Sequence, residues 1–217
     1  TQAVAYFPEP GAPADPGGVA LVLGGGNVSS IGPMDALYKL FVENRVVLLK
    51  VHPVNAYLGP ILAEVFACLI ARGFLRLAYG GVEEGAYLAA HPGVGELHVT
   101  GSDRTYDAIV YGPGEEGRRR KERDEPINLR PFTAELGNVS PWIVVPGAWS
   151  AGDLAYQAEN LATSLANNAG FNCNATRVVI TWEGWPERAA FLDALRAAWA
   201  KIPYRTAYYP GAAERFA

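Results

Sequence analysis

Cys173 is the residue whose neighbours most suggest covalent chemistry. It lies in the stretch NAGFNCNATR, among asparagine and glycine rather than the apolar residues that usually surround a core cysteine. The thiolate is the nucleophilic form, and an unperturbed thiol with a pKa of ~8.5 is only a few per cent ionised at neutral pH. Local N–H donors would favour the thiolate. The residue types alone leave both a nucleophile and an unreactive thiol open.

Glu135 is a candidate general base, because it is an acid among apolar residues in FTAELGNVSP. Partial burial raises the pKa of a carboxyl group and suits it to accept a proton near neutral pH. A carboxylate close to Cys173 would raise the pKa of the thiol, yet it could act as a base at another step. The alternative is a surface glutamate at the end of a strand, which this stretch by itself favours.

Three strand ends carry features that suit a nucleotide. LGGGNVSSIG (23–32) follows a strand and precedes a helix, but the G-x-G-x-x-G template placed on Gly24 and Gly26 meets Ser29, so a plain tight turn is the alternative. Lys50 ends an apolar strand where open α/β sheets bind ligands, and it could bond ribose hydroxyls or a phosphate, or simply be solvated. In VTGSDRT (99–105), Gly101 and Ser102 start a helix, which suits a pyrophosphate or simple capping by Ser102.

The elements that would position these residues alternate along the chain. Continuous apolar strands followed by helices indicate βαβ units and a parallel sheet. We predict strands at 19–24, 46–51, 75–80 and 96–101 and helices at 34–44, 58–73, 83–91 and 102–112. Residues 1–18 are predicted to be an irregular lead-in, and the mixed charges of 113–130 favour a solvated loop over an anion site. Extended segments at 131–136, 141–147 and 178–181 and helices near 152–167 and 186–200 complete the prediction.

Composition restricts the class of protein. The chain has 217 residues, 50% of them hydrophobic, and a net charge of −4, which argues against nucleic acid or an anionic membrane as a partner. No apolar run approaches the ~20 residues needed to span a bilayer, and no signal peptide is recognisable at the start. Two cysteines form no disulfide framework, so we expect a cytoplasmic protein. Cys68 is expected to be an ordinary core cysteine on a helix, and the three histidines show no metal-ligand spacing, so no metal site is expected.

Five landmarks in order make the chain resemble the aldehyde dehydrogenase superfamily. TAELGNVSP is similar to the general-base segment E-L-G-G-K-S-P, and NNAGFNCNATR to the nucleophile segment N-x-G-Q-x-C-x-x-x-x-R. Asn27 in GGGNVSS matches the asparagine of P-W-N-F-P, and Lys50 follows it at the family's spacing. VTGSDRT matches the F-T-G-S turn. The landmarks cover nearly the whole chain, and together they are far more specific than any one of them.

The resemblance implies a role for each residue. Cys173 would attack an aldehyde to form a thiohemiacetal and, after hydride transfer to NAD or NADP, a thioester. Asn27 and the backbone N–H of Cys173 would form the oxyanion hole, and Glu135 would activate the hydrolytic water. Lys50 would hold the adenine-side ribose. The remaining cofactor-binding residues would be Gly81, Gly101, Ser102 and Thr105.

The resemblance also implies a fold and its limits. We expect a Rossmann-like parallel sheet with flanking helices in residues 1–137, as part of an NAD(P)-binding domain, and the start of an α/β catalytic domain in 138–217. The family's downstream E-x-F-G-P segment and its dimer-exchanging strand are absent, so we expect an internal fragment that is weakly active or inactive alone. The full-length protein would be a homo-dimer or tetramer acting on a small aldehyde.

Several positions depart from the family pattern and leave alternatives open. Pro53 stands where NAD-preferring members often carry a glutamate, so the choice between NAD and NADP stays open. The other departures are Tyr106 after the pyrophosphate turn, Asn138 and Val139 in the general-base segment, and Phe171 in the nucleophile segment. Two other functions compete with aldehyde oxidation: a CoA-acylating or reductive relative, and a non-catalytic nucleotide-binding module on the same scaffold.

Overall fold

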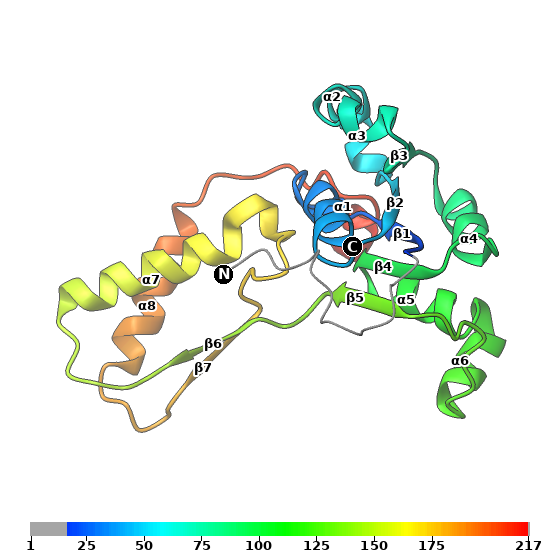
Figure 1. Ribbon diagram of the computed structural model, residues 1–217. Coiled ribbons are helices and arrows are strands. Elements are labelled where there is room, and N and C mark those ends of the chain that lie inside the picture. Colours follow the sequence, from blue (N-terminus) through cyan, green and yellow to red (C-terminus); the bar gives the residue numbers. More distant parts are fainter. Residues whose placement is uncertain (1–16, 217) are drawn as a thin grey trace, which may run out of the picture. The chain divides into compact units, whose positions relative to one another are not determined.

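The computed structural model describes residues 17–216 (Figure 1). The chain forms two compact units, Thr1–Gly137 and Asn138–Ala217, and each is described by itself. Most of the predicted lead-in, residues 1–16, lies outside the described residues. Within residues 17–216, no helix is both long enough and apolar enough to cross a membrane.

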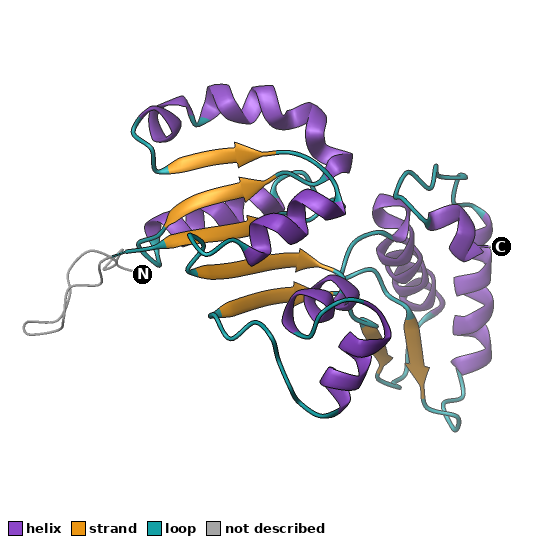
Figure 2. Cartoon of the chain, turned by 90° about the vertical axis from the view of Figure 1, so that its right-hand side faces the viewer, coloured by secondary structure: helices purple, strands orange, loops and turns teal. Residues whose placement is uncertain are grey.

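The first unit is built on a five-stranded parallel sheet, which confirms the predicted fold class. The strands are β1 (Val19–Leu23), β2 (Val46–Lys50), β3 (Leu75–Ala78), β4 (Glu96–Gly101) and β5 (Phe132–Leu136). Their order is β3-β2-β1-β4-β5, and all arrows point the same way (Figure 2). The central strand β1 is buried on both faces, because its apolar side chains meet helices on each side.

Helices cover both faces of this sheet. They are α1 (Ile31–Phe41), η1 (Pro53–Leu58), α2 (Gly59–Val65), α3 (Ala67–Ala71), α4 (Val82–Ala90), α5 (Asp103–Val110) and α6 (Gly114–Glu122). Ala36 and Leu40 of α1 pack with Leu69 and Ile70 of α3 on the face formed by β1, β2 and β3. The opposite face, centred on Leu21 and Leu97, packs against α4 and α5. Alternate residues of β1 and β2 therefore serve two separate cores.

Two sequence predictions for the segment 58–73 were wrong. The segment 58–73 was expected to be one helix, but it breaks at Phe66, whose backbone (φ −101°, ψ 19°) ends α2 before α3 begins. Cys68 was expected in the core, yet it is exposed, because α3 turns its neighbours Leu69 and Ile70 toward the sheet instead. Extending one helical periodicity across residues 58–73 therefore assigned Cys68 to the core, although its side chain is exposed.

The charged stretch 113–130 was expected to be a solvated loop, but it contains the helix α6. Its surface is charged, as expected, but its backbone is helical because acidic residues in the first turn pair with basic residues one turn later. Glu115 bonds Arg119 at 2.6 Å, and Glu116 lies 3.5 Å from Arg120. The order of acids before bases also complements the helix dipole.

The amino-terminal edge of the sheet holds a buried charge cluster. Lys39 of α1 is 3% exposed, and its Nζ lies 2.6 Å from Glu43 Oε2 and 3.0 Å from Glu96 Oε1. Arg45, just before β2, donates from Nε to the other oxygen of Glu96 at 2.8 Å. Glu96 is the first residue of β4. The cluster therefore ties α1 and the approach to β2 to the start of β4.

The second unit is a two-stranded parallel sheet with two packed helices. Its elements are β6 (Pro141–Val144), α7 (Ala151–Ala166), η2 (Asn167–Gly170), β7 (Val178–Thr181), α8 (Arg188–Ala200) and α9 (Ala212–Phe216). Leu161 of α7 and Phe191 of α8 are both 1% exposed and lie in its core with Trp185. Ser150 caps α7 by accepting from Asp153 N, and Asp153 bonds back to Ser150 N.

Candidate active site

The carboxyl-terminal edge of the five-stranded sheet collects most of the predicted site residues. Asn27 follows β1, Lys50 ends β2, Gly81 follows β3, and Gly101 with Ser102 follows β4. The strand order reverses between β1 and β4, since β2 and β3 lie on one side of β1 and β4 and β5 on the other. Open α/β sheets bind ligands in the crevice at such a reversal. The turns carrying Asn27 and Ser102 flank this point.

The glycine turn after β1 is packed tightly against both neighbouring strand ends. A Cβ on Gly25 would lie 3.1 Å from Thr100 of β4, and one on Gly26 would lie 2.3 Å from the ring of His52, which follows β2. The Asn55 side chain donates to Gly25 O at 3.1 Å. A side chain at position 26 would therefore displace the ring of His52, so close approach rather than a left-handed backbone explains this glycine. The half-buried Asn27 comes next in the chain.

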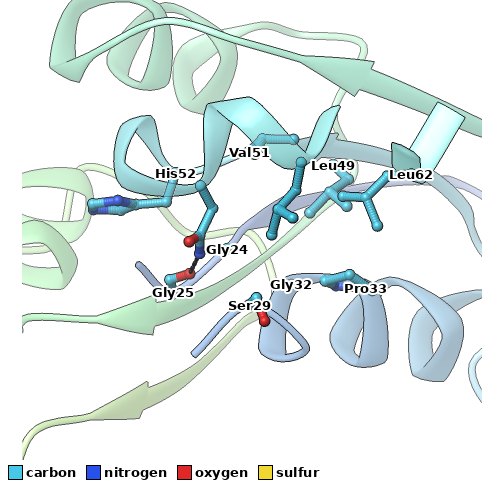
Figure 3. A pocket seen from close by; sticks show the side chains of 11 residues that line it. Gly24, Gly25, Ser29, Gly32, Pro33, Leu49, Val51, His52 and Leu62 are labelled. Carbon is cyan, nitrogen blue, oxygen red and sulfur yellow. Dashed lines mark hydrogen bonds between the residues drawn. The ribbon is translucent and has the colours of Figure 1, made fainter. Parts of the chain in front are cut away.

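A pocket opens between this turn, the start of α1 and the end of β2. In Figure 3, Leu49 and Leu62 line one side and Gly32 and Pro33 the other, and the bond to Gly25 O is drawn as a dashed line. Its lining mixes apolar side chains with the polar groups of Ser29, His52 and Asn55, and its volume of about 10 Å³ holds little more than one water molecule. The full set is Gly24, Gly25, Ser29, Gly32, Pro33, Leu49, Val51, His52, Asn55, Leu58 and Leu62.

Lys50 is buried rather than solvated, being 6% exposed. Its Nζ donates to Gly80 O at 2.7 Å, and burial lowers its pKa, an effect that the charge of Glu84 partly opposes. Among the described residues, no carboxylate bonds this ammonium, because Glu84 instead accepts from Gly81 N at 2.7 Å as the cap of α4. The lysine thus holds a partly desolvated charge that an incoming hydroxyl or phosphate oxygen would stabilise.

His52 is held beside Lys50. Its Nδ1 accepts from Val54 N at 3.2 Å, which in the neutral ring places the proton on Nε2. Burial and the neighbouring Lys50 charge lower the pKa of this imidazole. Both effects favour the neutral form of His52, whose ring forms one wall of the pocket.

The turn after β4 has the capping geometry that the sequence predicted. Ser102 Oγ accepts from Thr105 N at 3.2 Å and lies 3.1 Å from Thr105 Oγ1. Gly101, Ser102 and Thr105 are all exposed. Asp103 adds a carboxylate to the same turn and accepts from Arg104 N at 2.8 Å. Negative charge here opposes a phosphate, while the helix start favours one.

Glu135 lies on β5 and is exposed, as the surface-glutamate alternative predicted, and the partial burial that would suit a general base is absent. It pairs with Thr100 in the register of β4 and β5, and Thr133, two residues earlier, shares its face of the sheet. On this face His98 Nδ1 lies 2.8 Å from Thr133 Oγ1, and its Nε2 lies 3.3 Å from Asp35 Oδ2. Glu135 thus borders a polar strip on an otherwise apolar face.

Cys173 lies in the second unit, on the loop that follows α7, and its side chain is exposed. Ser140 Oγ donates to Cys173 O at 2.6 Å. The backbone before it is left-handed at Asn168 (φ 50°), Ala169 (φ 53°) and Gly170 (φ 78°). For a residue with a Cβ such as Ala169 this conformation costs about 1–2 kcal/mol, and backbone strain of this kind is concentrated at functional sites.

The structure therefore brings together Asn27, Lys50, Gly81, Ser102 and Glu135 at one sheet edge, all in the first unit. Cys173 belongs to the second unit. The convergence of Cys173 with Asn27 and Glu135 accordingly belongs to the proposal below.

Sequence reasoning missed several residues of this edge. His52 and Asn55 follow β2 in HPVN, and only the fold reveals that they contact the glycine turn. The polar strip could have been predicted from the sequence, because the polar residues Glu96, His98 and Thr100 occupy alternate positions of one strand. Alternation of period two places them on a single face. The hydroxyl of Thr100 there donates to Asp35 at 2.9 Å.

Comparisons with known proteins identify the family. The model of the aldehyde dehydrogenase family matches residues 13–210. A curated relative, N-succinylglutamate 5-semialdehyde dehydrogenase from Sphingopyxis alaskensis, is 28% identical over 76% of this chain, which spans about a third (32%) of that relative's length.

Solved structures share the fold. An aldehyde dehydrogenase from Mycobacterium tuberculosis complexed with NAD+ has a TM-score of 0.63 at 24% identity, covering 86% of this chain and 35% of that one. An NADP-dependent glyceraldehyde-3-phosphate dehydrogenase from Bacillus halodurans complexed with NADP has a TM-score of 0.64 at 21% identity, covering 83% and 34%. With the family match extending over most of its length, this chain belongs to the aldehyde dehydrogenase family.

Proposed function

We propose that the protein containing this chain oxidises an aldehyde to a carboxylic acid with NAD or NADP. The observation that carries the proposal is the family match over residues 13–210. Within that range, the two stretches that resemble the family's general-base and nucleophile segments contain Glu135 and Cys173. The chain covers about a third of its relative, so the activity is proposed for the whole protein.

The surroundings of Lys50, at the carboxyl-terminal edge of the sheet, suit the binding of a dinucleotide. A buried ammonium whose charge is only partly compensated suits the hydroxyls of a ribose, and Gly26 keeps the neighbouring turn close to the backbone of the site. Gly81 would lie near the adenosine, and Gly101, Ser102 and Thr105 near the pyrophosphate. Asp103 would weaken the pyrophosphate contact. When bound, the nicotinamide supplies a hydride acceptor.

The chain's own residues would divide the chemistry between them. The thiolate of Cys173 attacks the aldehyde carbon, and the carbonyl oxygen becomes an oxyanion in a thiohemiacetal. The side-chain amide of Asn27 and the backbone N–H of Cys173 stabilise that oxyanion, where one such donor is worth about 10²–10³ in rate. Loss of hydride leaves a thioester on Cys173. Glu135 then takes a proton from water, which attacks the thioester and releases the acid and the thiol.

The test follows NAD(P)H formation by the full-length protein with a panel of aldehydes, with each cofactor in turn. Cys173→Ser should abolish turnover, Asn27→Ala should lower kcat by about 10²–10³, and the matched control Cys68→Ser should change neither, because Cys68 lies on an exposed helix surface. Turnover that survives in Cys173→Ser would overturn the proposal.

The competing functions are separate outcomes of the same assay. Product release that depends on added CoA, with Glu135→Gln showing normal rates, identifies a CoA-acylating relative. Absence of turnover with every aldehyde, together with alkylation of Cys173 no faster than that of a peptide thiol, identifies a nucleotide-binding module. Assembly of the full-length protein into a dimer or tetramer stays a prediction, and its mass in solution measures it.

A further inference from the structure

Two tyrosines near the end of the chain cover the loop that carries Cys173. We call residues 168–175 the nucleophile loop. The ring of Phe171 in this loop lies 5.0 Å from the ring of Tyr208, edge to face, and 5.5 Å from that of Tyr209. The Tyr208 hydroxyl also donates to Asn168 Oδ1 at 3.0 Å. Both aromatic stacking and a hydrogen bond therefore join a segment distant in sequence to the loop.

Asn168 is linked by further hydrogen bonds to the residues that precede Cys173. Its side-chain Nδ2 donates to Asn172 Oδ1 at 2.9 Å, and its backbone oxygen accepts from Phe171 N at 3.0 Å. Asn172 in turn accepts at its backbone oxygen from Ala175 N at 3.1 Å, closing the turn around Cys173. The chain of bonds from Tyr208 therefore ends at the residue directly before the thiol.

The nucleophile loop begins in a conformation that its sequence does not favour. Asn168 and Ala169 both have left-handed backbones, although only glycine adopts this conformation without a steric penalty. Strained backbone of this kind persists only where surrounding contacts over-determine it. Cys173 itself is exposed. The contacts with Tyr208 supply one constraint from outside the loop, and the bond from Ser140 Oγ to Cys173 O supplies another.

We propose that Tyr208 is a positioning residue, which latches the nucleophile loop through Asn168 so that Cys173 is held in one geometry. The Phe171 stack aligns the tyrosine ring, and the hydroxyl fixes the Asn168 amide, which in turn orients Asn172. The latch bears on catalysis only if Cys173 is the nucleophile of the proposed function. Its effect on the loop can be measured without any turnover.

The test compares Tyr208→Phe with Tyr209→Phe by hydrogen exchange. Each variant removes one hydroxyl and keeps the ring, and Tyr208→Phe removes the donor of the bond to Asn168 Oδ1. One lost hydrogen bond corresponds to about a five-fold change in a local opening equilibrium. We expect amides of the peptide 168–175 to exchange about five-fold faster in Tyr208→Phe, with little change in Tyr209→Phe and none in peptides of α7 or α8.

Alkylation of the two cysteines gives a second readout in the same molecules. The rate at Cys173 should change at least two-fold in Tyr208→Phe, while the rate at Cys68, in the other unit, stays constant as an internal control. Unchanged exchange in the nucleophile loop, or an equal rise throughout α7 and α8, would overturn the latch. If Cys173→Ser kept full turnover, the proposed function would fail while the exchange result still decided the latch.

Discussion

One buried lysine lies at each end of the five-stranded sheet, and the pKa values of the two lysines are shifted in opposite directions. At the amino edge, Lys39 contacts two carboxylates, Glu43 at 2.6 Å and Glu96 at 3.0 Å. Burial would lower the pKa of Lys39, but these hydrogen bonds outweigh it and the pKa is raised. At the carboxyl edge, Lys50 is almost equally buried, yet burial prevails and its pKa is lowered.

The difference separates a structural charge from one suited to a ligand. The Lys39 cluster satisfies its charges internally, so an additional anion would gain little there. Lys50 donates to a carbonyl oxygen and has only the more distant charge of Glu84 to offset its desolvation. A buried cation with incomplete compensation is the feature expected where a protein binds hydroxyl or phosphate oxygens. Similar burial therefore serves stability at one edge and, in our proposal, binding at the other.

Glu96→Gln should give the largest effect, a loss of stability. The substitution removes the carboxylate that holds both Lys39 and Arg45, leaving Lys39 with Glu43 alone. Breaking a buried ion pair on one side costs about 3–5 kcal/mol. Urea unfolding followed by circular dichroism measures it, with the surface variant Glu115→Gln as control. A loss below about 1 kcal/mol would contradict a structural role for the amino-edge cluster.

This contrast between edges was only partly visible in the sequence. Apolar runs predicted the four strands β1 to β4, because strands covered on both faces have few polar positions. The serine at 102 predicted its own cap. Pairing between Lys39 and Glu96 could not be predicted, because it depends on how α1 lies across β4. The break at Phe66 and the exposure of Cys68 are likewise decided by packing, which local periodicity does not encode.

The candidate site shows the same division. Asn27, Lys50, Glu135 and Cys173 were singled out by motif order. The burial of Lys50 ran against its local expectation, while the exposure of Glu135 agreed with the surface glutamate that its own stretch favoured. Contacts from segments remote in sequence, such as His52 on Gly26 or Tyr208 on Asn168, carried no motif. A motif identifies which side chain does chemistry, but the residues that hold it come from the tertiary structure.

Lys50→Met should weaken cofactor binding with a much smaller effect on stability. A hydrogen bond from a charged group contributes about 1.5–3 kcal/mol, which corresponds to a 10- to 100-fold rise in Kd for NAD or NADP. Methionine keeps the apolar stem in place, and relief of desolvation offsets the lost bond to Gly80 O. Isothermal titration of the full-length protein measures the affinity, and Lys39→Met is the matched control. Equal losses of affinity in both variants would remove the distinction between the edges.

The pH dependence of stability should have opposite signs for the two lysines. The folded pKa of Lys39 is raised, so its contribution is complete below the unfolded value of 10.5 and is lost as pH rises through the folded pKa. The folded pKa of Lys50 is lowered, so the unfolded chain binds more protons just below 10.5 and stability rises with pH there.

Denaturant titrations between pH 8 and about pH 11.5 measure how the free energy of unfolding changes as these two lysines titrate. Relative to wild type, Lys39→Met should lose the alkaline fall and Lys50→Met should lose the alkaline rise. At the acid end, the hydrogen bonds of Arg45 and Lys39 overcome burial and lower the pKa of Glu96. Its contribution is therefore present above about pH 4.5 and lost as pH falls through the folded pKa, a limb that Glu96→Gln should lack. The same sign for both lysines would refute the comparison.

Glu84→Gln should have the smallest effect and isolates the remaining charge near Lys50. Glutamine can still accept from Gly81 N through its amide oxygen, so the cap of α4 is kept while the charge is removed. Since Glu84 opposes the effect of burial, the pKa of Lys50 should fall further in this variant. An NMR titration of the lysine side chains measures it, with Glu83→Gln in the same helix turn as control. A pKa of Lys50 that stayed constant would mean that Gly80 O alone compensates the ammonium, and that Glu84 acts purely as a cap.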